Sequence, residues 1–273
     1  PTIIQGNRYM DATLYTGTSS NQSIVNAAQF KPDLLWGKLR SQNGQHVLTD
    51  SVRGTNSQLF SSLTVAQESN TDAFTAFNAN GFSVGANTSG TYTQNDINYL
   101  SATIVCWQWQ AGQGTTSSGT GTGGITSVTQ SVNTTAGFSI VTYTGSGANG
   151  TVTHGLGVAP KMIIIKRRNV ASNWIVYHAS ISTPQDNFLY LNSTSATINA
   201  GVVFNSTNPT STVITVGTDA TTNANTGTYV AYCFAEIAGF SKFGSYTGNG
   251  STDGPFVYLG FRPKFIMIKR SDS

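Results

Sequence analysis

His46, Asp50 and Ser51 lie close together in the sequence and are the residue types of a hydrolase triad. A nucleophilic serine needs a histidine within hydrogen-bond reach and a carboxylate that orients the imidazole. In an extended strand, positions 46 and 50 share a face about 13 Å apart, which is too far for a direct hydrogen bond. The chain also has no G-x-S-x-G nucleophile elbow. We therefore predict that the protein is not an enzyme.

The sequence also gives little support for a metal site or for a pair of catalytic carboxylates. The 11 acidic residues are dispersed along the chain, so neither a glycosidase carboxylate pair nor a calcium cluster is indicated. His154 and His178 have no Cys or His partner at metal-ligand spacing. We expect hydrogen-bonded histidines near strand ends, no bound metal and no cofactor.

Aromatic residues offer a different chemistry, because a flat ring can stack on the apolar face of a sugar. Trp107 and Trp109 stand two positions apart and so share one face of a strand. Aromatic residues in such alternation usually pack in a core, which is the interpretation that we favour over a sugar-binding platform. The candidates for the platform are Trp107, Trp109, Trp174, Tyr177, Tyr190 and Tyr232.

The two cysteines, Cys106 and Cys233, each stand five residues before an Ala-Gly pair. Equivalent positions in two copies of a module lie far apart in space, each within its own core. We therefore predict two buried free thiols and neither a disulfide nor a metal site.

Composition narrows the class of protein. Only 9% of the 273 residues are charged, against about 25% in ordinary soluble proteins. The apolar fraction of 38% and the aromatic fraction of 11% are too high for a disordered polar chain. The net charge of +3 is scattered, and its densest patch, 166–168 (KRR), is interpreted as a solvated strand end. We expect neither nucleic-acid binding nor membrane insertion, since the chain lacks clustered basic residues and long apolar runs.

A repeated pattern organises the chain. A Tyr-Thr-Gly triplet is followed, at the same spacing each time, by a proline and then an apolar run that ends in basic residues. The runs are LLWGKLR, MIIIKRR and FIMIKR, and the Tyr-to-Pro pairs are Tyr15 and Pro32, Tyr143 and Pro160, and Tyr246 and Pro263. Such regular spacing indicates a duplicated module.

Short strands and tight turns dominate the pattern within each copy. The run 34–39 predicts a strand, and the Asn43-Gly44 dipeptide predicts a hairpin that pairs it with the segment after it. Asn80-Gly81 predicts a second turn before another strand. The second half holds about seven further strand candidates, spaced as in a sandwich or barrel. No helix of three turns is predicted.

These patterns predict a mostly β protein with two tandem β-sandwich or barrel-like repeat domains and the start of a third repeat. The expected segments are an N-terminal arm (1–14), a first domain (15–112), a Gly/Ser/Thr-rich flexible or surface-laid linker (113–137), a second domain (138–239) and a partial third repeat (240–273). We expect the arm to pack on a neighbouring subunit. The third repeat either continues beyond Ser273 or completes a sheet elsewhere in this chain or in another subunit.

Four segments of the first domain carry a family resemblance. FKPDLLWGKL at 30–39, HVLTDSVRG at 46–54, GFSVG at 81–85 and IVCWQWQAG at 104–112 follow one another in an order that resembles a repeat family of unknown function. That family is found in structural and fibre-like virion proteins of marine, cyanophage-like tailed phages. Gln110, where lysine is common, and Gly37, inside the first strand, depart from the pattern.

The resemblance implies a non-enzymatic structural protein of a bacteriophage virion, on the tail or the capsid exterior. A tail fibre or host-attachment component is favoured, with other virion proteins and copies of itself as partners, a trimer as one form, and a host surface glycan as a candidate ligand. A head decoration, collar or cement protein that stabilises the capsid or neck is the first alternative. A protein that binds or degrades surface polysaccharide is the second.

Overall fold

The computed structural model describes residues 6–87 and 96–272. Strands hold 37% of the residues and helices 2%, so the prediction of a mostly β protein is confirmed. The paired strands are all antiparallel within the described residues. None of the sheets closes into a barrel, which leaves the sandwich as the architecture of each unit.

Unit one, residues 6–112, contains a six-stranded sheet and a three-stranded sheet, preceded by a single 3-10 turn, η1 (Gly6–Arg8). The predicted hairpins at Asn43-Gly44 and Asn80-Gly81 are both confirmed. Gly81 has φ +154°, and a Cβ there would lie 2.0 Å from the Ile24 carbonyl oxygen, so only glycine fits this turn. In spatial order, the strands of the six-stranded sheet are β1 (Met10–Thr16), β9 (Thr103–Trp109), β3 (Leu34–Leu39), β4 (His46–Asp50), β5 (Ser57–Phe60) and β6 (Glu68–Ser69). The strands of the three-stranded sheet are β2 (Gln22–Val25), β8 (Gly81–Val84) and β7 (Phe74–Asn78).

Unit two, residues 113–239, contains an eight-stranded sheet, a two-stranded sheet and one short helix, α1 (Ala220–Asn223). No helix in the described part of the chain has the length and hydropathy needed to cross a membrane. In spatial order, the strands of the eight-stranded sheet are β10 (Ser117–Ser118), β11 (Thr126–Asn133), β12 (Phe138–Thr144), β19 (Thr228–Phe234), β14 (Met162–Arg167), β15 (Trp174–His178), β16 (Asn187–Tyr190) and β17 (Ile198–Asn199). The two-stranded sheet consists of β13 (Gly150–Thr153) and β18 (Val213–Val216).

The two large sheets share their strand order and register. The order β1-β9-β3-β4-β5-β6 in unit one matches β12-β19-β14-β15-β16-β17 in unit two. Leu34, two residues after Pro32, lies opposite Asp50 and Trp109. Met162, two residues after Pro160, lies opposite His178 and Phe234. The small sheets correspond as well, because β2 pairs with β8 as β13 pairs with β18.

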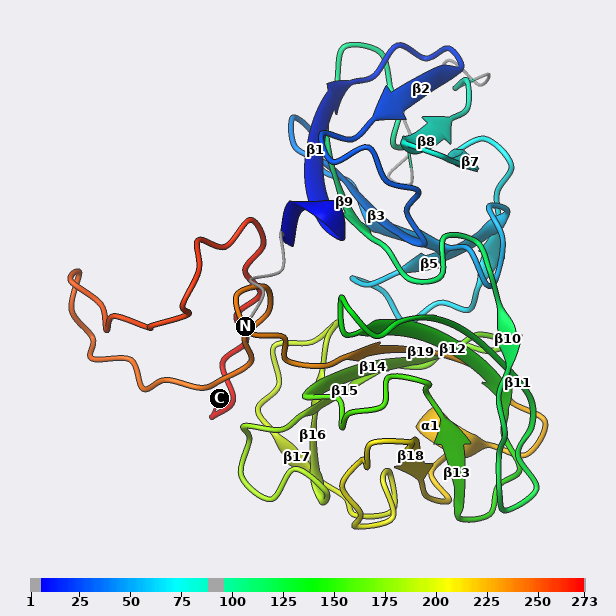
Figure 1. The fold of residues 1–273 in the computed structure, drawn as a ribbon, viewed down its shortest axis with the longest axis vertical. Helices are drawn as coiled ribbons and strands as arrows, with labels where there is room; N and C mark the ends of the chain where they lie inside the picture. The colour runs from blue at the N-terminus through cyan, green and yellow to red at the C-terminus, as the bar shows by residue number, and fades with distance from the viewer. Residues whose placement is uncertain (1–5, 88–95, 273) are drawn as a thin grey trace.

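The two large sheets pack face to face and bury a core between the units (Figure 1). The side chains of this inter-unit core include Leu34, Trp36, Leu48 and Trp109 from unit one and Phe138, Ile164, Trp174, Val230 and Tyr232 from unit two. The opposite face of each large sheet is covered by the small sheet of its own unit. Both large sheets are therefore buried on two sides, which explains why β3 and β14 are apolar at nearly every position.

Two predicted boundaries are wrong. Of the expected arm 1–14, residues 10–14 belong to β1, the edge strand that pairs with β9, and residues 1–5 lie outside the described part. The expected linker 113–137 contains β11, which pairs with β12. Its Ile125 and Val128 are buried in the core of unit two. Only 113–124 runs over the surface, where Gly119 and Thr122 hydrogen-bond to neighbouring backbone.

The C-terminal segment, residues 240–272, has no strand in the structure. Figure 1 shows it as a wide loop, orange to red, that leaves the body at the junction of the units and returns to it. It touches the body through Phe265, whose ring lies 5.2 Å from that of Trp109, and through Lys264, whose Nζ lies 3.1 Å from Asp11. Near its end, the Ser271 carbonyl accepts a hydrogen bond from the Thr197 amide.

Candidate functional site

The triad-like residues of the sequence do not come together. Trp36 Nε1 donates to His46 Nδ1 at 3.1 Å, and the His46 ring stacks on Trp107. Ser51 Oγ donates to Asp33, not to a histidine. Burial lowers the pKa of His46, and the nearby Lys38 charge lowers it further. The arrangement fixes the hairpin and presents no activated nucleophile.

Asp50 instead lies in a polar cluster buried between the units. Arg53 Nε donates to Asp50 Oδ2 at 2.5 Å, and neither side chain is exposed to solvent. Tyr232 Oη, from unit two, donates to the same Asp50 oxygen at 2.8 Å. Burial disfavours the charged guanidinium, but Asp50 and Tyr232 beside it raise the pKa of Arg53 above its usual value. Sequence reasoning missed this cluster, although an Asp three residues before an Arg is a recognisable signal.

The basic patch 166–168 is not a solvated strand end, as the sequence predicted. Lys166 is buried, and its Nζ donates to the carbonyl oxygens of Thr64 and Arg167. Arg168 Nε donates to Gln67 Oε1. Burial lowers the pKa of Lys166 to about 8, and Arg167 adds to the shift. The patch therefore joins β14 to the 64–67 loop of unit one.

The two remaining histidines form hydrogen bonds with backbone groups. The Leu156 amide donates to His154 Nδ1, which assigns the proton to Nε2, 3.1 Å from the Thr210 carbonyl. His178 Nδ1 accepts from the Ser180 amide. Burial lowers the pKa of both rings. In 6–87 and 96–272 no group of three or more His, Cys, Asp or Glu is placed to hold a metal ion.

The predictions for the aromatics and the cysteines fare better. Trp109, Trp174, Tyr177 and Tyr232 are buried, while Trp107 and Tyr190 are partly buried, so core packing is confirmed. Cys106 and Cys233 are buried free thiols, as predicted, and burial raises the pKa of Cys233 to about 12.

The two thiols do not occupy equivalent positions, however. Cys106 pairs with Gly37, and Cys233 pairs with Ile163. Gly37 lies five residues after Pro32, whereas Ile163 lies three residues after Pro160. The cysteines are therefore two positions apart in the repeat, on the side of the strand that faces each unit's own core.

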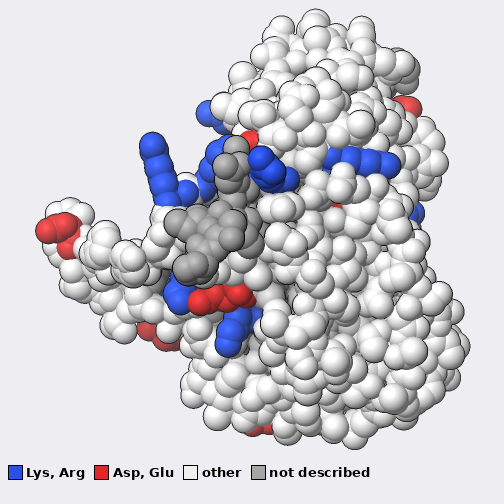
Figure 2. All heavy atoms as spheres, in the orientation of Figure 1, with Lys and Arg blue, Asp and Glu red and all other residues white. Residues whose placement is uncertain are grey.

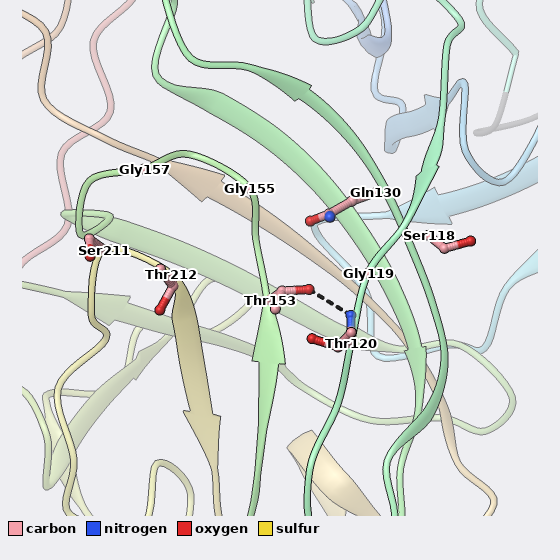
Figure 3. A pocket seen from close by; sticks show the side chains of 9 residues that line it. All are labelled: Ser118, Gly119, Thr120, Gln130, Thr153, Gly155, Gly157, Ser211 and Thr212. Atoms are coloured by element: carbon pink, nitrogen blue, oxygen red, sulfur yellow. Dashed lines mark hydrogen bonds between the residues drawn. The ribbon is translucent and has the colours of Figure 1, made fainter.

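A pocket of about 370 Å³, lined by polar residues, opens between the 118–120 segment and the end of β13 (Figure 3). The Thr120 amide donates to Thr153 Oγ1 at 2.9 Å across it, and Gln130 Oε1 is buried there without a hydrogen-bond partner. The lining is Ser118, Gly119, Thr120, Gln130, Thr153, Gly155, Gly157, Ser211 and Thr212. It has hydroxyl and amide groups and no ionisable side chain, so it can bind a polar molecule only by hydrogen bonds.

The largest apolar surface lies on the C-terminal segment. More than half of the exposed large apolar side chains in the described residues belong to 246–268. Phe256 is 89% exposed and Tyr258 78%. Together with Val257, Leu259, Gly260, Phe261 and Pro263 they line a hollow of about 500 Å³. Exposed apolar surface of this extent is typical of a site that binds another polypeptide.

Charged side chains accompany this surface, since Asp253, Arg262 and Lys264 lie in the same segment. Figure 2 shows one face of the molecule with few charged side chains, and the Lys and Arg residues on it gather near the junction of the units. No basic stripe of the kind that binds nucleic acid crosses this face.

Residues 5–273 match the family described as Domain of unknown function (DUF7483). The chain belongs to this family. No curated protein and no solved structure matches it. The description of DUF7483 names no activity, so the role of this DUF7483 chain is inferred from its own surfaces, of which the apolar C-terminal one is the most extensive.

Proposed function

We propose that the chain is a non-enzymatic structural protein of a bacteriophage virion, a component of a tail fibre or other host-attachment structure. The observation that carries the proposal is the exposed apolar surface of 246–268. A soluble monomer seldom leaves such a surface uncovered, and a protein that works through assembly needs one. The resemblance of 30–112 to repeats of fibre-like virion proteins supports the virion setting.

The assignment of a structural role rests on what the two units do with their polar groups. The buried Asp50–Arg53 pair, Lys166 and Trp174 Nε1 all form hydrogen bonds across or beside the unit boundary. These contacts make one rigid body from two units. We propose that this body assembles with other virion proteins and with further copies of the chain. The pocket beside β13 is the candidate binding site for a host glycan.

A second candidate is a head decoration, collar or cement protein. The observation that favours it is the reach of the C-terminal segment, which projects from the body as a wide loop (Figure 1). Decoration proteins stabilise a shell by extending segments across neighbouring subunits, and such a loop suits that role.

The location of the chain in intact particles tests both candidates. A small epitope inserted at 42–44, the exposed hairpin turn of unit one, can be labelled with a gold-conjugated antibody and seen by electron microscopy. Label on slender tail appendages would support the fibre proposal. Label over the capsid lattice or at the neck would overturn it in favour of the decoration protein, and absence of label from particles that package DNA would overturn both.

A further inference from the structure

We propose that the free edge of strand β1 pairs with β1 of a second copy of this chain and so joins the six-stranded sheets of the two copies. β1 (Met10–Thr16) is the end strand of that sheet, and within the described residues it pairs on one side only, with β9. The inference rests on the proposed function, because it names the edge through which copies of the chain assemble.

β1 is much longer than the other strands at the edges of the large sheets. These two open sheets have four edges, and three of them end in strands of two residues, β6, β10 and β17. β1 has seven residues. The edge strands of the two small sheets have four or five. Because a short strand offers little backbone to another chain, β1 is the edge in the described part of the chain that is best suited to pairing.

β1 also lacks the features that usually protect an edge. Its run MDATLYT contains no Pro and no basic residue, and its register with β9 has no bulge. Its one carboxylate, Asp11, is 4% exposed and accepts hydrogen bonds from the Ala27 amide and from Lys264. Edges are commonly blocked by exposed charges, prolines or bulges, so nothing of this kind opposes a second strand at β1.

The hydrogen-bond phase shows which backbone groups are free. The Gly17 amide donates to the Ala102 carbonyl at 2.8 Å, one step beyond the last pair of the β1–β9 register. In an antiparallel pair, alternate residues bond to the partner strand, so the odd-numbered residues of β1 bond to β9. The N–H and C=O groups of Ala12 and Leu14 therefore point away from β9, where the described residues provide no strand to bond them.

Unit two shows how such an edge is covered. β12 is the counterpart of β1, and β11 pairs with it antiparallel along most of its length. Figure 1 shows β11 alongside β12, whereas β1 lies at the outer margin of unit one. The repeat therefore indicates that the covering element is an antiparallel strand, and no described strand of this chain takes that place in unit one.

β1 of a second copy fits the free edge because the edge is complementary to itself. A two-fold axis at Thr13 sets Ala12 of each chain opposite Leu14 of the other. Both residues have their free groups on the outer side, so all the outward N–H and C=O groups of Ala12 and Leu14 form hydrogen bonds across the axis. Asp11 then lies opposite Tyr15, and no like charges meet.

Sedimentation velocity on the 1–273 chain over a wide concentration range tests the inference. We expect a concentration-dependent dimer whose dissociation constant rises about 10-fold or more in each of two variants. Ala12→Pro removes an outward N–H without removing a bond to β9, and Leu14→Lys puts two like charges near the axis at a side chain that is 62% exposed. Val202→Lys, at an exposed position of unit two, should dimerise like the wild type. Circular dichroism and the urea midpoint check that each variant is folded.

Amide exchange measured residue by residue by NMR tests the pairing itself. The amides of Ala12 and Leu14 should exchange at least about 10-fold more slowly in the dimer than in the monomer. The Thr13 amide, already bonded to β9, is the internal control and should stay protected in both. A monomer at every concentration would overturn the inference, as would a dimer that both variants leave intact or one in which Ala12 and Leu14 still exchange fast.

The same amides also show whether another chain takes the place of the second copy. A chain that is monomeric in solution but has Ala12 and Leu14 protected in intact particles would assign the edge to a different polypeptide and overturn self-pairing. Dimerisation is measured on the purified chain and the location of the label on particles, so failure of the dimer and failure of the virion role can be told apart.

Discussion

Arg53 and Asp50 form an ion pair that solvent does not reach, and Tyr232 from the other unit completes it. Removing a charge from water costs several kcal/mol, and the cost is offset only when every polar atom finds a partner. Here Arg53 also donates to the Ser57 carbonyl and to Gln67. The cluster therefore fixes the alignment of the two large sheets as well as contributing stability.

Tyr232→Phe should lower the free energy of unfolding by about 2 kcal/mol, because it removes a hydrogen bond to a buried carboxylate. Urea unfolding followed by tryptophan fluorescence measures the change. Tyr190→Phe is the matched control, with an expected effect within about 0.5 kcal/mol, since Tyr190 is partly exposed and its ring packs on Phe188. Equal effects of the two substitutions would mean that the cluster is not intact in solution.

Lys166 should make the free energy of unfolding depend on pH. Burial lowers the pKa of Lys166 to about 8 from its usual value of 10.5. Between these values the unfolded chain binds more protons than the folded one, so this group makes the free energy of unfolding rise with pH, by up to about 1.4 kcal/mol per pH unit. Lys166→Met removes that contribution. The wild-type value minus the variant value should grow from pH 8 to pH 10, and a constant difference would show that Lys166 titrates normally.

At the scale of the elements, the sequence identified those strands whose turns are explicit. The strand 34–39 and both hairpins form where the Asn-Gly dipeptides predict them, although Gly81 is the one residue of the two dipeptides with a positive φ. The sequence did not predict strand β11, because its residues, TSVTQSVN, include only two large apolar side chains. A strand flanked by a long partner can be stabilised by backbone hydrogen bonds and one buried side chain, which composition alone does not reveal.

The stacking of the two large sheets also escaped prediction, although a signal was present. MIIIKR is apolar at every position before its basic end, and a strand with one solvated face would alternate. That pattern indicates burial on both faces but does not identify the covering element. Likewise, Asp50 was considered only beside its sequence neighbours, while its decisive partner, Tyr232, lies 182 residues away.

Val128→Ala should lower the free energy of unfolding by about 1 to 3 kcal/mol, because Val128 fills the core of unit two from β11. Thr126→Ala, in the same strand but exposed, should change it by less than about 0.5 kcal/mol. Thermal denaturation by calorimetry compares the two. If both substitutions are neutral, residues 126–133 behave as the tether that composition suggested.

At the scale of the whole molecule, the inter-unit core makes the two units depend on each other. Separated units would expose Trp36, Trp109, Phe138 and Ile164 to water, and burial of a large apolar side chain contributes about 1.5 to 3 kcal/mol. We therefore expect one cooperative unfolding transition for the chain, with equal calorimetric and van't Hoff enthalpies. Two resolved transitions would show that the units fold independently.

The C-terminal segment gives the molecule its most exposed apolar side chains. Phe265 ties it to the shared core, while Ile266, Ile268 and the 256–261 hollow remain open. Under the proposed function, another polypeptide covers these residues in the particle.

Amide hydrogen exchange of the 256–268 peptide, compared between the free chain at low concentration and intact particles, tests that claim most directly. We expect fast exchange in the free chain and strongly slowed exchange in the particle, with peptides of β14 and β19 protected equally in both. Equally fast exchange of 256–268 in both states would contradict it, because the segment would then be uncovered where the protein works.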